Sequence, residues 1–226
     1  MKFFVKKIVA IVFLLFLTIG CLEEIDIDEG ENPNTNNSNS ETTNHYKRIG
    51  MHDGSFDDII DNNSCNSVVL PVSLLANNTP LTLSSSSDYQ LVIDIFNLTP
   101  INTDTIVFNF PITIMNQDYS QISITNASQL DDLSTICDVA INTNLSAINC
   151  VDIIYPINIS LFNTNTNQTT IISIDKDQDL FNFMANLSIN EAYSVQYPIK
   201  TTITGNVNLT VSSDSELKSI INDCIN

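Results

Sequence analysis

Four stretches of the chain alternate apolar and polar residues around a proline. They read VVLPVSL around Pro71, FNFPITI around Pro111, IIYPINI around Pro156 and VQYPIKT around Pro198. Alternation with a period of two predicts a strand that buries one face. Each proline falls on the opposite face and cannot donate to a ladder, which indicates an edge position or a bulge. Because the prolines follow one another at intervals of 40, 45 and 42 residues, we infer an internal repeat.

Each predicted strand is followed by a polar turn, a second short strand and a helix. The second strands are expected to end near Leu83, Ile124, Ile174 and Val211. A cap residue with Gln or Glu three places later predicts each helix start: Ser87 with Gln90, Asn126 with Gln129, Asp175 with Gln178, and Ser213 with Glu216. Apolar stripes at helical spacing follow the caps: Leu91, Asp94, Ile95, Leu98; Leu130, Leu133, Ser134, Cys137; Leu180, Phe183, Met184, Leu187; and Leu217, Ile220, Ile221, Cys224. The sequence therefore predicts four ββα units.

The N-terminus predicts export and lipidation. Residues 1–20 contain three lysines followed by an apolar run, residues 8–17, which is too short to span a bilayer and fits a signal peptide. Residues 17–21 (LTIGC) resemble a lipobox, in which the sulfur of Cys21 takes a diacylglycerol. We therefore expect Cys21 to be the lipid attachment site that anchors the protein to a membrane.

Four cysteines remain besides Cys21, and an even number in an exported chain favours disulfides. Cys65 and Cys150 each lie six residues before a repeat proline, whereas Cys137 and Cys224 close the helices of units two and four. Because one unit is too small to bury a core, we predict Cys65–Cys137 and Cys150–Cys224 bonds. They bracket two ββαββα domains, 65–137 and 150–226, joined by a linker over 138–149. The predicted class is α+β, with antiparallel sheets and helices on one face.

Residues 21–64 are predicted to form a tether. The stretch 23–31 is acidic and 32–43 is rich in Asn, Ser and Thr, a composition with little apolar surface to bury. The acidic stretch resembles the export signal of Bacteroidetes lipoproteins displayed on the outer face of the outer membrane. A cell-surface location is therefore expected.

The net charge of the chain limits the classes of molecule that it can bind. The chain has 8 basic and 26 acidic residues, a net charge of −18. Removal of residues 1–20 takes away three lysines and leaves five basic against 26 acidic residues, a net charge of −21. Nucleic acid is a poor partner for such a chain, because binding it requires clustered Lys and Arg.

The motifs over residues 65–226 resemble those of uncharacterised Bacteroidetes (flavobacterial-type) lipoproteins. These repeat a YPI or FPI strand, a turn, a strand and a capped helix that ends in Cys. Copy one departs from the pattern, with Leu70 in place of the aromatic residue and Asp94 in its stripe. The resemblance implies the repeat fold and the envelope location, and it implies no activity.

Candidate chemistry is sparse. Asp175, Asp177 and Asp179 have the spacing of an EF-hand opening, but Leu180 and Asn186 stand where that loop needs Gly and Glu, so they are interpreted as a helix cap. The two histidines, His45 and His52, are interpreted as solvated residues of the tether. No catalytic residue, metal site or cofactor is predicted.

Tandem modules suit multivalent binding, so we expect a non-enzymatic binding or structural lipoprotein with a glycan or protein ligand. The alternative is an enzyme or accessory protein that acts on polysaccharide.

Overall fold

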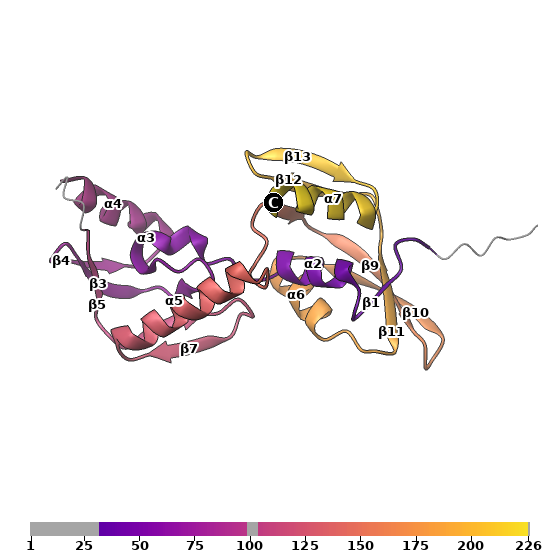
Figure 1. Cartoon of the computed structure of the whole chain (residues 1–226), viewed down its shortest axis with the longest axis horizontal. Helices are drawn as coiled ribbons and strands as arrows, with labels where there is room; N and C mark the ends of the chain where they lie inside the picture. Colours follow the sequence, from indigo (N-terminus) through magenta and orange to yellow (C-terminus); the bar gives the residue numbers. More distant parts are fainter. Residues whose placement is uncertain (1–31, 99–103, 226) are drawn as a thin grey trace, which may run out of the picture. The chain divides into compact units, whose positions relative to one another are not determined.

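A computed structural model describes residues 32–98 and 104–225. The predicted signal peptide and Cys21 lie outside these residues. The fold is α+β, as predicted, and it contains two separate hydrophobic cores. We call residues 51–142 the first lobe, and residues 34–50 with 146–225 the second lobe (Figure 1).

The first lobe contains two ββα units. Its strands and helices are η2 (Ser55–Asp57), α3 (Asp58–Asp61), β2 (Ser67–Val68), β3 (Val72–Ala76), β4 (Thr79–Leu83), η3 (Ser86–Asp88), α4 (Tyr89–Leu98), β5 (Ile106–Phe108), β6 (Ile112–Met115), β7 (Gln121–Ile124) and α5 (Ala127–Asn142). The units are β3-β4-α4 and β6-β7-α5, and their second strands end at Leu83 and Ile124, as predicted.

The second lobe repeats this arrangement and adds a strand and a helix from the N-terminal side. Its elements are β1 (Asn36–Asn37), α2 (Glu41–Ile49), β8 (Val151–Ile154), β9 (Ile157–Asn163), β10 (Gln168–Ile174), α6 (Asp177–Ala185), β11 (Glu191–Val195), β12 (Ile199–Ile203), β13 (Val207–Val211) and α7 (Asp214–Ile225). The units β9-β10-α6 and β12-β13-α7 are present, with second strands that end at Ile174 and Val211, as predicted.

The prediction of one continuous strand around each proline is wrong. The proline separates two strands that belong to different sheets, and the peptide bond before each of the four prolines is cis. The short strand before the proline pairs with the neighbouring unit: β2 with β6, β5 with β3, β8 with β12, and β11 with β9. Because proline has no N–H to donate, the ladder ends there. The two strands of each unit are therefore joined by a third strand from the other unit of the same lobe, and in unit three β1 adds a fourth.

The helix stripes of units two and four are confirmed, and that of unit three is confirmed up to Met184, because α6 ends at Ala185, before Leu187. The stripe and cap of unit one are wrong. The cap is Ser85, which forms a capping box with Asp88, so the helix is set two residues earlier than predicted. Tyr89 and Val92 are therefore buried, while Leu91 and Leu98 are 45% and 79% exposed. In unit three the N-cap is Lys176 rather than Asp175, and it forms no side-chain cap.

Both predicted disulfides are present. Cys65 joins Cys137 in the first lobe, with Cα atoms 5.5 Å apart, and Cys150 joins Cys224 in the second, with Cα atoms 6.1 Å apart. The linker predicted over residues 138–149 is wrong in its first part, because α5 continues to Asn142. Leu130 and Leu133 hold this helix on the first core.

The tether predicted over residues 21–64 is wrong from residue 34 onward. Ser40 caps α2, and the core of the second lobe takes in Tyr46 and Ile49 from this helix. In the first lobe α3 buries Ile60. The composition of this stretch is polar overall, but its few large apolar residues are spaced three apart on one helix face, and short polar side chains cap the helix. Its average composition therefore conceals an ordered segment.

Candidate functional site

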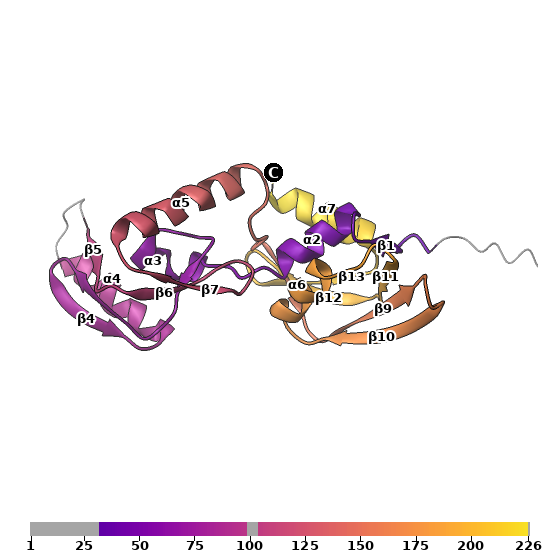
Figure 2. The same ribbon diagram turned by 90° about the horizontal axis from the view of Figure 1, so that it is seen from below.

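Residues 34–49, the N-terminal part of the second lobe, pack against its repeat units, and we call them the docking segment. β1 pairs antiparallel with the edge strand β11, where Asn36 lies opposite Tyr193. α2 then lies between α6 and α7 (Figures 1 and 2). Tyr46 is fully buried, and Gly50 ends the helix where an added Cβ atom would lie 2.7 Å from the backbone nitrogen of Phe181. The segment is thus packed closely against the repeat units.

Tyr197 and Asp214 anchor the docking segment. The Tyr197 hydroxyl donates to Asp214 Oδ1 at 2.5 Å and lies 2.8 Å from the Tyr46 hydroxyl. Asn36 Nδ2 donates to the other oxygen of Asp214 at 2.6 Å, and the Asp214 N–H donates to Asn34 at 3.0 Å. Burial raises the pKa of Asp214, while the hydrogen bonds from Tyr197 and Asn36 act against that rise. These contacts join the start of α7, and Tyr197 just beyond β11, to residues 151 to 180 positions earlier in the chain.

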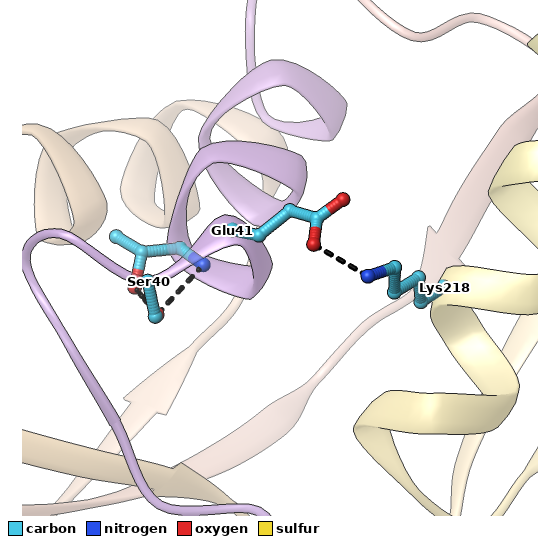
Figure 3. A network of polar contacts seen from close by, with 4 residues as sticks. Ser40, Glu41 and Lys218 are labelled. Carbon is cyan, nitrogen blue, oxygen red and sulfur yellow. Dashed lines mark hydrogen bonds and ion pairs between the residues drawn. The ribbon is translucent and has the colours of Figure 1, made fainter.

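Three further contacts hold the start of α2. Lys218 of α7 forms an ion pair with Glu41, and this pair lowers the pKa of the Glu41 carboxyl (Figure 3). The Ser40 hydroxyl accepts from the Thr43 N–H at 3.3 Å, which caps the helix. The Thr43 hydroxyl lies 3.0 Å from the Tyr193 hydroxyl of β11. Four residues of unit four therefore contact the docking segment: Tyr193, Tyr197, Asp214 and Lys218.

Units two and four align without a gap at a separation of 87 residues, which is the distance from Pro111 to Pro198 and from Cys137 to Cys224. The same separation identifies the first-lobe counterparts of the four anchoring residues. They are Ile106 for Tyr193, Phe110 for Tyr197, Ala127 for Asp214 and Asp131 for Lys218. Three polar positions are thus apolar in the first lobe, and the cation is replaced by an anion.

These four counterparts line one groove, with a volume of about 560 Å³. It lies between α3, α4, β5 and the start of α5, and its apolar lining includes Ile59, Phe96, Ile106, Phe108, Phe110 and Leu130. α3 lies between α4 and α5 in both views (Figures 1 and 2). With four residues instead of the nine of α2, it occupies only part of the space that the docking segment fills in the second lobe.

The groove is acidic. Its lining includes Asp58, Asp61, Asp104 and Asp131, and none of the described lining residues is basic. Burial and the neighbouring charge of Asp57 raise the pKa of Asp61 to about 8. Asp57 itself has 0% exposure and accepts from the Val68 N–H at 2.7 Å, and burial raises its pKa to about 7. A cation in the groove would favour the charged form of Asp61, so the site is suited to an apolar ligand with a positive group.

The residues considered from sequence as candidates for metal binding or catalysis do not line this groove. Burial lowers the pKa of both histidines. His45 is 6% exposed on α2, and the Nε2 of His52 lies 2.6 Å from the Ser67 hydroxyl, so their interpretation as solvated residues is wrong. Asp177 accepts from the Tyr155 hydroxyl at 2.7 Å. Within residues 32–98 and 104–225, no three His, Cys, Asp or Glu side chains are grouped so that they could hold a metal ion.

Sequence reasoning missed the groove because its walls come from two units that exchange strands. The signal that could have found it is the gapless alignment of units two and four, in which the charge inverts between Asp131 and Lys218. In the part of the chain that the structure describes, no helix is long and apolar enough to cross a bilayer. No family model, curated protein or solved structure matches the chain.

Proposed function

We propose that this protein is a lipid-anchored binding protein of the cell envelope, displayed on the outer face of the outer membrane, and that the first-lobe groove is its binding site. The observation that carries the proposal is the difference between the lobes. The second lobe covers the space between its repeat helices with its own docking segment, whereas the first lobe leaves an apolar groove there. Apolar concave sites with a few polar groups are the usual places for ligands.

The anchor rests on residues 1–21. A short apolar run, a lipobox-like stretch and Cys21 support export and lipidation. Replacing Cys21 with Ser should leave an unlipidated precursor that no longer partitions into detergent. Protease added to intact cells should remove the lobes from the anchored protein. A Cys21→Ser protein that still enters the detergent phase contradicts the anchor, and full protection from protease contradicts the surface location.

Binding is tested by photo-crosslinking in intact cells. A photoreactive amino acid at Val107, which lines the groove and is 54% exposed, should form an adduct with an envelope macromolecule. The matched control is Ile171 of β10, which is 64% exposed on the second lobe. Adducts at both positions, or at neither, contradict a binding site in the groove. Turnover of a polysaccharide that is lost on Phe110→Ser would instead favour the alternative, an enzyme or accessory protein acting on polysaccharide.

A further inference from the structure

We propose that the first-lobe groove binds a segment of a partner polypeptide that adds an antiparallel strand to β5 and places an apolar helix face and a basic side chain in the groove. This inference rests on the proposed function and specifies the class of ligand. The second lobe supplies the pattern, because its docking segment forms a strand on β11 and then a helix between α6 and α7. β5 and α5 are the first-lobe counterparts of β11 and α7.

β5 offers an edge for a strand. Within the described residues it is the last strand of the sheet β4-β3-β5. Asn109 N–H, just beyond β5, donates to the Ser73 carbonyl of β3 at 2.9 Å, so the odd-numbered residues here face β3. Alternate residues of an antiparallel strand direct their main-chain groups to opposite sides. Ile106 and Phe108 therefore direct theirs to the outer edge, where an extended peptide can pair with them.

The side chains specify what the ligand carries. Tyr193, Tyr197 and Asp214 hold the docking segment through hydroxyl and carboxylate groups. Their first-lobe counterparts, Ile106, Phe110 and Ala127, have only apolar side chains. Polar anchors in the ligand would be desolvated there without partners, so its buried face must be apolar.

Asp131 sets the charge of the ligand. It occupies the place of Lys218, which pairs with Glu41 of the docking segment. A ligand residue in the position of Glu41 must therefore be basic. The docking segment of a second copy fits less well, because its Glu41 would face Asp131 and its Asn36, Thr43 and Tyr46 would meet apolar side chains.

A redesigned docking segment tests the proposal. The probe is a synthetic peptide of residues 34–49 with Asn36→Val, Glu41→Lys, Thr43→Leu and Tyr46→Phe, and the reference peptide keeps the natural sequence. Binding to the full chain carrying Cys21→Ser is measured by fluorescence anisotropy. We expect the redesigned peptide to bind at least about tenfold more tightly than the reference, a ratio that corresponds to about 1.4 kcal/mol.

A charge exchange at the groove makes the test specific. Asp131→Lys should weaken the binding of the redesigned peptide and strengthen the binding of a version that retains Glu41. The matched control is Asp138→Lys, which adds the same charge on the exposed surface of α5 outside the groove lining and should change neither affinity. Equal binding of the redesigned and natural peptides overturns the inference, and so does an Asp131→Lys variant that binds both as before.

The crosslinking experiment tests separately whether the groove is a binding site and whether its ligand is a polypeptide. An adduct at Val107 that protease digests supports a polypeptide ligand. An adduct that resists protease and yields to glycan hydrolysis retains the binding site but overturns the polypeptide inference. The absence of any adduct at Val107 overturns the proposed function itself.

Discussion

The two lobes share one fold but differ in how they close the space between their repeat helices. In the second lobe the docking segment enters the core, which then contains 16 buried apolar residues against 12 in the first lobe. In the first lobe the four-residue α3 closes only part of that space and a groove remains. A duplicated scaffold has thus kept its strands and disulfides while one copy buries a segment of its own chain and the other leaves its equivalent surface open.

Polar residues change together between the lobes. In both units of the second lobe, the residue before the repeat proline is a tyrosine that donates to an aspartate at the first position of the helix: Tyr155 to Asp177 and Tyr197 to Asp214. In the first lobe the corresponding pairs are Leu70 with Ser86 and Phe110 with Ala127. The tyrosine and the aspartate are both present or both absent, as expected when the tyrosine hydroxyl and the carboxylate serve as each other's hydrogen-bond partners.

The largest expected effect comes from removing a disulfide. Each bond closes a loop of 72 or 74 residues, which in the chain-entropy model stabilises the fold by about 4 kcal/mol. Cys65→Ser with Cys137→Ser should therefore lower the free energy of unfolding of the first lobe by about 4 kcal/mol. The matched variant, Cys150→Ser with Cys224→Ser, should destabilise the second lobe. Because that lobe has the larger core, it should stay folded more readily after losing its bond.

Thermal unfolding and peptide-resolved hydrogen exchange measure which lobe opens first. If the first lobe without its disulfide stays folded to a higher temperature than the second lobe without its own, the inferred difference in stability between the two cores is wrong. Non-reducing peptide mapping checks the pairing itself. Finding Cys137 joined to Cys150, or four free thiols in protein from the envelope, excludes the two bonds as structural elements.

The second expected effect is confined to the second lobe. Tyr46 has 0% exposure and its hydroxyl lies 2.8 Å from that of Tyr197. Tyr46→Ala should lower the free energy of unfolding by about 3 kcal/mol, because it removes a large buried ring from the core. Tyr46→Phe keeps the ring and should cost only about 1 kcal/mol for the lost hydrogen bond. Hydrogen exchange should show the first lobe unchanged, and equal protection losses in both lobes would contradict this assignment.

Sequence patterns predicted the local parts of this fold and missed the long-range ones. The second strands end at Leu83, Ile124, Ile174 and Val211 because alternation and polar turns are local signals. The strand exchange at each proline was missed, since a strand's partner is chosen by sheet packing that no local pattern encodes. The cap of unit one was misplaced because Ser84 to Ser87 offer four adjacent serines. The capping box with Asp88 and the burial of Tyr89 are both satisfied when Ser85 is the cap.

The candidate site was beyond local patterns for the same reason. Its lining comes from α3, α4, β5 and α5, which lie far apart in sequence. The docking segment was also missed, because polar residues dominate it by composition and only Tyr46 and Ile49 enter the core. The charge inversion between Asp131 and Lys218 was visible in the sequence, but it acquires meaning only once Glu41 is found beside Lys218.

A pH dependence of the first lobe is the third expected effect. The folded-state pKa values of Asp57 and Asp61, about 7 and about 8, lie above the ordinary value of 3.8 because both carboxyl groups are buried. The folded lobe therefore binds these protons more tightly than the unfolded chain does. The stability that these two groups contribute should be fully present below pH 4 and should be lost as the pH rises through 7 and 8.

Urea unfolding at pH 5 and pH 8.5 measures this loss. Asp61→Asn should reduce it, because an amide has no proton to release, whereas Asp131→Asn at the groove rim should leave it unchanged. Saturation with the redesigned peptide should also reduce the loss, since its lysine favours the ionised form of Asp61. A first lobe that becomes more stable as the pH rises would contradict the raised pKa values.

The smallest expected effect concerns the ion pair between Lys218 and Glu41, whose side chains are 45% and 59% exposed. Exposed pairs contribute little because water and salt screen them, so Lys218→Asp, which copies Asp131, should leave the melting temperature almost unchanged. Repulsion between the introduced carboxylate and Glu41 should nevertheless loosen the first turn of α2, because the ion pair that holds this turn to α7 is replaced by two like charges. Hydrogen exchange of the first turn of α2 should increase at low salt and return toward the natural rate at high salt or on adding Glu41→Lys. If the first turn stays equally protected in Lys218→Asp, the charge at this position does not select the segment, and the basic residue inferred for the ligand of the first lobe loses its basis.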